Sequence, residues 1–532
     1  MTSGRAGRLK ATLGQIDELI RAGRLGEAEA LARRAVAESP LSAQAQFALG
    51  FIAQSTGRFE VAEPAFARAV TLEPRNAEYL TYSGLCLLSM GRVPEAAARY
   101  NKAREVDARG FETLWRYGSF LSRIGHLEEA LPVFETALAR APDGARHAIR
   151  LDVVESLLSL GRVEEAEEKL RRDLDRTAFR SRYLCLLSGT RKHDAATDVY
   201  ALVEREITRP GLSVEDRSDL MVRKGVMLHN SGRHAEAFAT ILEGKKLLRA
   251  PSAVPAFTRE VDQRIATFTA ERIAEYQKLY SRNDESPIFV VGLPRSGTTL
   301  AAQIISAHSK VGNAGELETM TYAAAKLGGM KPLSDFAAAL ASTGEKGVSE
   351  IAAFYARVLR FVVPEKEQLL DKMPQNFRFI AEASILFPRA RFVHCIRHPA
   401  DTFISAFQTE MNAAHSYSYD PAEYAAYFRQ YQRLMQHWNR VLPGRIFTLS
   451  YEALVSDPGT VIPALLGFLG LSVEDACLHP ERNAAAVTTF SRLQVRAGIN
   501  TGSVQRWKPY ERFLAPLLDA AQTEGLAAAM TG

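Results

Sequence analysis

The sequence contains little cysteine. Four of its 532 residues are cysteines, and no two of them stand in a CxxC pair. Such scattered cysteines argue against a disulfide framework and against a zinc site. A reducing compartment therefore fits the chain best. The four residues are Cys86, Cys185, Cys395 and Cys477.

Long hydrophobic runs are missing as well. Arg, Lys, Asp and Glu interrupt the segment from Met1 to Leu25, and no later stretch reaches the roughly 18 apolar residues of a membrane span. We therefore expect neither a secretory signal nor a membrane span, and we predict a cytoplasmic protein.

The chain also lacks a strong excess of one charge. Its formal net charge is +5, and the Lys and Arg residues are spread over most of the length. This gives little support for nucleic-acid binding, although it leaves room for a local anion pocket. With 47% hydrophobic and 24% charged residues, a chain of this length is expected to form two or three globular units.

What the N-terminal half does have is an internal period. Five glycines, four of them in Gly-Arg pairs, follow one another at spacings of 34, 34, 34 and 36 residues. An alanine stands five residues after each, a proline seventeen residues after three of them, and another glycine seven residues before three of them. The five glycines are Gly23, Gly57, Gly91, Gly125 and Gly161.

Each period reads as two amphipathic helices joined by a glycine turn, with the alanine allowing close packing and the proline ending the second helix. Stacked units would form a solenoid with a concave surface. The pattern resembles the tetratricopeptide repeat over residues 8–175. We interpret residues 176–285 as a diverged repeat and helical linker, with one degenerate unit near 216–250. The period leaves open whether the array binds a partner peptide or serves as a scaffold, oligomeric or not.

A second domain is expected over residues 286–532. Ile288–Val291 reads as a buried strand, Gly292–Thr299 as a glycine-containing loop, and the residues up to about Ala307 as a helix. This is the geometry of a phosphate-binding loop, whose amides and helix N-terminus favour anions. A Walker A loop has lysine after its last glycine, but Thr298 stands there, so a nucleoside triphosphatase or P-loop kinase is disfavoured.

The loop Pro-Arg-Ser-Gly-Thr-Thr resembles the 5′-phosphosulfate loop of sulfotransferases that use 3′-phosphoadenosine-5′-phosphosulfate (PAPS). Three further elements occur in the order of that family: Lys372 in a Lys-x-Pro segment, Arg397 with Ser405 eight residues later, and Tyr451 in a Tyr-Glu-x-Leu segment. The resemblance covers residues 286–510. It implies that PAPS is bound by Arg295, Ser296, Gly297, Thr298, Thr299, Lys372, Arg397, Ser405 and Tyr451.

Strands are predicted near 288–291, 368–371, 391–396 and 446–450, each followed by helix-like sequence. We therefore expect an all-α repeat solenoid followed by an α/β, P-loop-like three-layer domain with a mainly parallel sheet. The residues named above then lie at the carboxyl ends of the strands, where ligands bind in such sheets.

Sulfuryl transfer needs cations on the leaving oxygen and a base for the acceptor hydroxyl. Arg295 and Lys372 would supply the cations. Glu316, 21 residues after Arg295, resembles the catalytic glutamate of tyrosylprotein sulfotransferases, and Glu318 is its rival. His398 and His308 are expected to have structural roles.

The C-terminal stretch around Ser491, Arg496 and Arg506 resembles a loop that covers the nucleotide, and a solvated surface loop is the alternative. The sequence departs from the tyrosylprotein pattern at Thr409, where a basic residue is expected, and at Arg496, where lysine is expected. Both departures concern the identity of the acceptor more than that of the donor.

The sequence thus predicts a PAPS-dependent sulfotransferase without a metal. It transfers a sulfuryl group to a hydroxyl of a protein, peptide or glycoconjugate that the repeat groove recruits or positions. The alternative is an interaction scaffold with a catalytically silent domain that binds adenosine 3′,5′-bisphosphate (PAP). Nucleic acid is not an expected partner, and the oligomeric state stays open.

Overall fold

The computed structural model describes residues 2–249, 251–330, 332–483 and 498–521. The chain divides into two compact units, residues 1–149 and residues 150–532. The second unit therefore contains the later helical hairpins together with the sheet. Among the described residues, no helix is long and apolar enough to cross a membrane.

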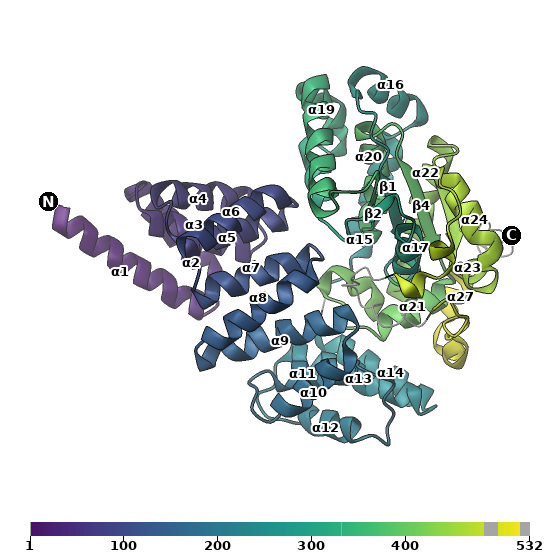
Figure 1. Ribbon diagram of the computed structural model, residues 1–532, viewed down its shortest axis with the longest axis horizontal. Coiled ribbons are helices and arrows are strands. Elements are labelled where there is room, and N and C mark those ends of the chain that lie inside the picture. Colours follow the sequence, from purple (N-terminus) through teal and green to yellow (C-terminus); the bar gives the residue numbers. More distant parts are fainter. Residues whose placement is uncertain (1, 250, 331, 484–497, 522–532) are drawn as a thin grey trace. The chain divides into compact units, whose positions relative to one another are not determined.

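The first unit is a succession of antiparallel helical hairpins (Figure 1). All of the turn glycines predicted in this unit have positive φ, for example 71° at Gly23 and 73° at Gly57, which explains the recurrence of glycine. The helices are α1 (Thr2–Arg21), α2 (Leu25–Glu38), α3 (Ala43–Ser55), α4 (Phe59–Leu72), α5 (Ala77–Ser89), α6 (Val93–Val106), α7 (Phe111–Arg123) and α8 (Leu127–Arg140).

The glycines that precede three of the turns by seven residues have a different function. A Cβ at Gly50 would lie 2.8 Å from the ring of Phe66, and a Cβ at Gly84 would lie 2.9 Å from the ring of Tyr100. These glycines let an aromatic ring of the second helix pack directly on the backbone of the first. The period therefore encodes both the turn and the helix–helix contact, and the predicted all-α array is confirmed.

The second unit begins with further helices that precede the sheet in the chain. The hairpin of α13 and α14 repeats the design, since Gly232 has φ 76° and a Cβ at Gly225 would meet Ile241 at 2.3 Å. The helices are α9 (Asp143–Leu160, which spans the division between the units), α10 (Val163–Asp173), α11 (Arg180–Leu187), α12 (Asp198–Ile207), α13 (Val214–Asn230), α14 (His234–Leu247), α15 (Val254–Thr267) and α16 (Ala270–Tyr280).

The described residues contain one parallel sheet in the order β2-β3-β1-β4-β5, and the predicted α/β domain is confirmed. The four predicted strands are present, and β2 is an additional short one at the edge. The strands are β1 (Ile288–Gly292), β2 (Val311–Asn313), β3 (Gln368–Asp371), β4 (Arg391–Ile396) and β5 (Ile446–Ser450).

Helices cover both faces of this sheet, which gives three layers. On one face, α17 and α24 pack with alternate strand residues such as Val290 and Val393 into a continuous apolar core. On the other face, Phe289 contacts Tyr355 of α19 and His394 contacts Tyr431 of α22. The helices are α17 (Thr298–Ser306), α18 (Thr319–Leu327), α19 (Phe336–Val362), α20 (Ile380–Leu386), α21 (Pro399–Phe407), α22 (Pro421–Val441), α23 (Tyr451–Ser456), α24 (Pro458–Leu469), α25 (Asp475–Leu478) and α27 (Ala515–Ala521).

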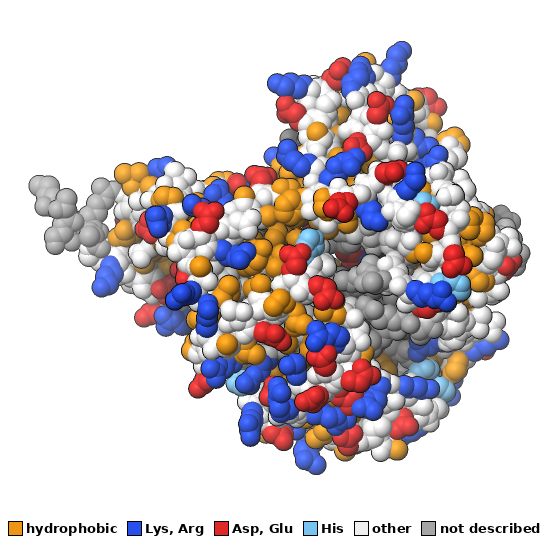
Figure 2. Space-filling view, viewed as in Figure 1, with side chains coloured by type: hydrophobic (Ala, Val, Ile, Leu, Met, Phe, Trp, Pro, Cys, Tyr) orange, Lys and Arg blue, Asp and Glu red, His pale blue; other side chains and the backbone are white. Residues whose placement is uncertain are grey.

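Charged side chains of both signs are interspersed over the face shown in Figure 2, which agrees with the small net charge. The side chains of the predicted site lie at the carboxyl ends of β1, β3, β4 and β5. The fold therefore brings together segments that are far apart in the sequence.

Candidate active site

The loop between β1 and α17 has the backbone of an anion-binding site. Gly297 has φ 100° and directly precedes α17, and its position as N-cap leaves that helix end without a side-chain cap in the described chain. A Cβ at Gly297 would lie 2.8 Å from the ring of Tyr451, so glycine is required there. Arg295 has φ 72°, a strained conformation for a residue other than glycine, of the kind found at functional sites.

Four of the predicted nucleotide-binding side chains meet at this loop. The Nε of Arg295 donates a hydrogen bond to Ser405 Oγ at 2.9 Å. Arg397 Nη1 donates to the Arg295 carbonyl at 3.2 Å, and the Arg397 guanidinium lies 4.7 Å from the centroid of the Tyr451 ring. These residues come from the ends of β1, β4 and β5 and from α21, as the sequence predicts.

Positive charge is concentrated at this point. Burial, followed by repulsion from Arg397 and Arg506, lowers the pKa of Arg295 to about 10. An anion between these guanidinium groups would remove that repulsion. Arg397 is only 7% exposed, and its Nε has no hydrogen-bond partner within the described residues. A buried donor without a partner is costly and points to a ligand acceptor.

A cavity of about 310 Å³ lies over these groups. The residues that line it are Arg295, Gly297, Thr298, Thr299, Leu300, Arg397, Ser405, Tyr451, Gly498, Asn500, Gly502, Ser503 and Arg506. The cavity is thus lined by the loop residues together with Arg397 and Ser405. This donor set, with no carboxylate among the described lining residues, fits a nucleotide that carries two separate phosphate groups.

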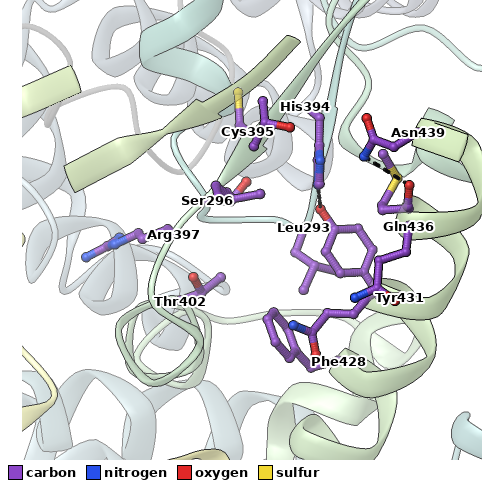
Figure 3. A pocket seen from close by; sticks show the side chains of 14 residues that line it. Leu293, Ser296, His394, Cys395, Arg397, Thr402, Phe428, Tyr431, Gln436 and Asn439 are labelled. Carbon is purple, nitrogen blue, oxygen red and sulfur yellow. Dashed lines mark hydrogen bonds between the residues drawn. The ribbon is translucent and has the colours of Figure 1, made fainter. Parts of the chain in front are cut away.

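Ser296 is the predicted loop residue whose side chain points elsewhere. Its Oγ is buried without a partner in the described chain and lines a separate cavity of about 130 Å³ between β4 and α22 (Figure 3). His394 lies in the same cavity, bonded through Nε2 to the Tyr431 hydroxyl, and burial lowers the pKa of His394 to about 3. Ser296 can therefore contact a nucleotide in the first cavity only through its backbone.

Lys372 and Glu316 form an ion pair beside the nucleotide cavity. Lys372 follows β3, is buried, and donates to the Glu316 carboxylate. The Lys372 amide also donates to the Gly315 carbonyl at 3.2 Å, which joins the ends of β2 and β3. Glu316 is exposed at the surface of an adjoining cavity. Glu318 is instead the N-cap residue of α18, and its carboxylate accepts from the Thr321 hydroxyl at 3.1 Å.

Asp371, the last residue of β3, directly precedes Lys372 and is held in place by hydrogen bonds of its own. Its carboxylate accepts hydrogen bonds from the Tyr355 hydroxyl and from Asn376 Nδ2, the latter at 3.1 Å. Burial raises the pKa of Asp371 to about 7. The side chain therefore fixes the position from which Lys372 extends.

Models of two known protein families match different parts of the chain. The model of the sulfotransferase family matches residues 287–475, and the tetratricopeptide repeat model matches residues 13–53, 52–110 and 121–179. The chain carries tetratricopeptide repeats and a sulfotransferase family domain.

Among curated relatives, an uncharacterized protein of Aquifex aeolicus is 27% identical over 384 residues, which are 70% of this chain and 50% of that protein. A putative protein-tyrosine sulfotransferase of Caenorhabditis briggsae is 25% identical over 42% of this chain and 81% of its own length. Protein-tyrosine sulfotransferase 2 of Gallus gallus is 27% identical over 43% of this chain and 65% of its own. The chain thus spans only half the length of the Aquifex protein.

The solved structures that are similar to parts of the chain include sulfotransferase domains and tetratricopeptide repeat proteins. The sulfotransferase domain of the Synechococcus PCC 7002 olefin synthase is 22% identical, with a TM-score of 0.35, and covers 46% of this chain and 95% of that domain. A tetratricopeptide repeat protein of Thermus thermophilus is 22% identical, with a TM-score of 0.31, and covers 34% of this chain and 98% of that protein.

The two histidines considered in the sequence have structural contacts in the sulfotransferase domain. His398 accepts from the Ala400 amide at the start of α21, and its ring stacks on Trp507 with centroids 5.1 Å apart. His308 is buried, and its Nδ1 accepts from the Lys310 amide at 3.1 Å. Neither residue is among the described residues that line the two cavities beside the ion pair.

The C-terminal stretch is described only in part. Ser491 and Arg496 lie outside the described residues. After them, the Ser503 carbonyl accepts from Arg397 Nη2, and the Gln505 and Trp507 amides donate to the Asp401 carboxylate at 2.7 and 3.0 Å. These bonds hold the described part of the stretch over the nucleotide cavity and place Arg506 in its wall.

The sequence did not predict most of the residues that line the cavity beside Lys372 and Glu316, to which Glu316 itself contributes. Thr409, where the pattern expects a basic residue, has Lys245 of α14 bonded to its carbonyl. His415 contacts Gln375 in the wall of this cavity, and burial lowers the pKa of His415. No motif marks these residues, because they lie in unrelated segments. The missed lining residues that carry a charge or an imidazole are Glu155, Arg182, Arg223, Glu410 and His415.

Proposed function

We propose that the protein transfers a sulfuryl group from PAPS to a hydroxyl of a protein, peptide or glycoconjugate. The observation that carries the proposal is the meeting of Arg295, Arg397 and Ser405 at one cavity, with Lys372 and Glu316 beside it. The family match supports the reaction class, and the relatives named protein-tyrosine sulfotransferases support a macromolecular acceptor.

Each side chain has a defined part in this proposal. Arg397 and Ser405 would hold the 3′-phosphate, while the loop amides and Arg295 would hold the 5′-phosphosulfate. The acceptor oxygen forms its bond to sulfur as the bond from sulfur to the phosphate oxygen breaks, and PAP leaves. Lys372 and Arg295 stabilise the charge that develops on that oxygen. The acceptor proton passes to the Glu316 carboxylate.

The ion pair between Lys372 and Glu316 is consistent with the roles proposed for these two side chains, namely stabilisation of the leaving oxygen and acceptance of the acceptor proton. The ion pair holds Lys372 next to Glu316, and Glu316 lines the adjoining cavity together with Arg295 and Thr298, where a hydroxyl would approach sulfur. A cytoplasmic location belongs to the same proposal and is supported by the four cysteines, all of which are buried and free. The repeat array is proposed to recruit the acceptor.

The test is transfer of radiolabelled sulfuryl from PAPS to capped peptides with a tyrosine and a serine and to an oligosaccharide, combined with calorimetry of PAP binding. We expect Arg295→Ala and Lys372→Ala to reduce transfer about 100-fold or more. Glu316→Gln should reduce transfer about 100-fold and leave PAP affinity unchanged, with Glu318→Gln as the matched control.

Equal loss of PAP affinity in the Arg295, Lys372 and Glu316 variants would contradict the separation of binding from proton transfer. Binding of PAP without transfer to any acceptor would instead favour the scaffold with a silent domain.

A further inference from the structure

The cavity beside Glu316 is walled by two different parts of the second unit. Its volume is about 510 Å³, within the range of about 300 to about 1,000 Å³ that is typical of ligand pockets. One wall comes from the sulfotransferase domain and includes Pro294, Met373, Gln375 and Asn412. The opposite wall comes from α9, α11 and α13 and consists of Glu155, Arg182, Cys185, Leu186 and Arg223.

Buried charges hold these helices against the domain. Arg223 of α13 donates from two nitrogens to the Glu410 carboxylate, and Glu410 is almost fully buried. Lys245 of α14 donates to the Thr409 carbonyl at 2.7 Å. Both bonds reach the segment 409–412, whose residues Glu410, Met411 and Asn412 line the cavity. The helices are thus a fixed part of the cavity wall.

The pair of Arg182 and Glu155 differs from the pair of Arg223 and Glu410. Arg182 Nη2 donates one hydrogen bond to Glu155 Oε1 at 2.8 Å, and the two side chains remain 41% and 38% exposed. An arginine has several N–H donors in a planar fork, so this guanidinium keeps donors for a ligand. Arg223, in contrast, is committed to Glu410 in a bidentate arrangement.

We propose that Arg182 and Glu155 are specificity-determining residues that read the charge of an acceptor peptide on either side of its hydroxyl residue. The inference rests on the proposed function. Glu316 occupies one part of the cavity and the charged pair another, so a residue next to the one that donates its hydroxyl would meet the pair. Gln375 and Asn412 supply amide groups that can bond to a peptide backbone.

The charges of the pair predict how selectivity changes in variants. With both residues present, the pair is neutral and favours neither sign strongly. Arg182→Ala leaves the Glu155 carboxylate, which repels acidic neighbours of the hydroxyl and attracts basic ones. Glu155→Gln leaves the Arg182 guanidinium and has the opposite effect. Because both side chains are partly exposed, each change should be about five-fold in kcat/KM.

The experiment uses the full chain, PAPS and three capped peptides. Each peptide contains one tyrosine and one serine as acceptors. The peptides differ only in the two residues that flank each acceptor, which are both Glu, both Gln or both Lys. Arg182→Ala should lower kcat/KM for the Glu peptide and raise it for the Lys peptide, and Glu155→Gln should do the reverse. Arg182→Lys should restore the wild-type order. Arg205→Ala, on the exposed surface of α12, is the matched control and should change nothing.

Other outcomes separate this inference from the proposed function. If the variants change kcat/KM for the three peptides by the same factor, the pair does not read charge and the inference is wrong, while sulfuryl transfer stands. A wild-type protein that binds PAP and sulfates none of the peptides would also overturn it. A wild-type protein that does not bind PAP would overturn the proposed function itself. PAP affinity and thermal unfolding should be unchanged in every variant.

Discussion

At the scale of single residues, the site depends on side chains whose charge or conformation is unfavourable without a ligand. Arg295 has a left-handed backbone and a lowered pKa, and Arg397 has a buried Nε without a partner in the described chain. Such features cost stability and are retained where binding or catalysis needs them. They mark this cavity as a candidate ligand site independently of any motif.

Asp371 gives a prediction about pH at this scale. Its pKa is raised from 3.8 to about 7 by burial, so the folded state binds this proton more tightly than the unfolded state. The resulting stabilisation is fully present below about pH 4 and is lost as the pH rises through 7. Its size is on the order of a few kcal/mol, since one pKa unit corresponds to about 1.4 kcal/mol.

The difference in free energy of unfolding between wild type and Asp371→Asn should therefore fall as the pH rises from 4 to 7. Urea unfolding at a series of pH values measures it. A difference that is independent of pH over this range would show that Asp371 is ionised throughout.

Much of the nucleotide cavity could be predicted from the sequence because its residues follow recognisable strands. Lys372 and Arg397 directly follow strands β3 and β4, and Arg295 lies in the loop after β1, so a parallel sheet must gather all three at one edge. Arg182 and Glu155 could not be predicted, since their place in the cavity depends on how α9 and α11 pack on the domain. Ser296 shows the limit of a motif, because its position in the loop does not reveal where its side chain points.

At the scale of elements, a few buried ion pairs join the helices that precede the sheet to the domain. Arg223 of α13 pairs with Glu410, and Arg264 of α15, which is 1% exposed, donates to Glu382 of α20 at 2.8 Å. Buried pairs add little net stability, but removal of one partner leaves a buried charge uncompensated. They fix which surfaces meet.

Arg223→Ala should accordingly destabilise the second unit by about 3–5 kcal/mol, because Glu410 remains buried without its partner. The double variant Arg223→Ala with Glu410→Gln should recover part of that loss. Arg24→Ala, in an exposed pair with Glu27, is the control and should leave the free energy of unfolding almost unchanged. Thermal and urea unfolding measure all of these. Equal effects of the Arg223 and Arg24 variants would contradict the structural role of the buried pair.

Helices and strands could be predicted where their sequence pattern extends over enough residues to be recognised. The repeats were recognised from a period of 34 residues, and four strands were recognised as apolar runs before loops. Strand β2 has only three residues, Val311–Asn313, and offers no such pattern. Its pairing with β3 arises from tertiary structure and brings Glu316 next to Lys372.

At the scale of the whole molecule, the helices from α10 onward belong to the same unit as the sheet. The sequence predicts a repeat array over residues 8–175 and a diverged repeat and helical linker over residues 176–285, ahead of a domain that begins at residue 286. The buried pairs of Arg223 and Arg264 show instead that the intervening helices complete the domain. The two compact units are residues 1–149 and 150–532.

Two truncated chains test this division. A chain that begins at residue 143, the start of α9, should fold and bind PAP with an affinity close to that of the full chain. A chain that begins at residue 286 should fail to fold, because Glu382 and Glu410 lose their buried partners and the apolar surface under α13–α16 becomes exposed. Circular dichroism and calorimetry distinguish the two. Full PAP affinity in the shorter chain would contradict the assignment of these helices to the domain.

The central claim is that this cavity binds the product nucleotide of PAPS-dependent transfer. Calorimetric titration with PAP, with ATP as the control and without magnesium, tests it most directly. We predict micromolar binding of PAP in preference to ATP, weakened about tenfold or more by Arg397→Ala, which removes charge-assisted hydrogen bonds to the 3′-phosphate. Absence of PAP binding, or equal binding of PAP and ATP that Arg397→Ala leaves unchanged, would contradict the account.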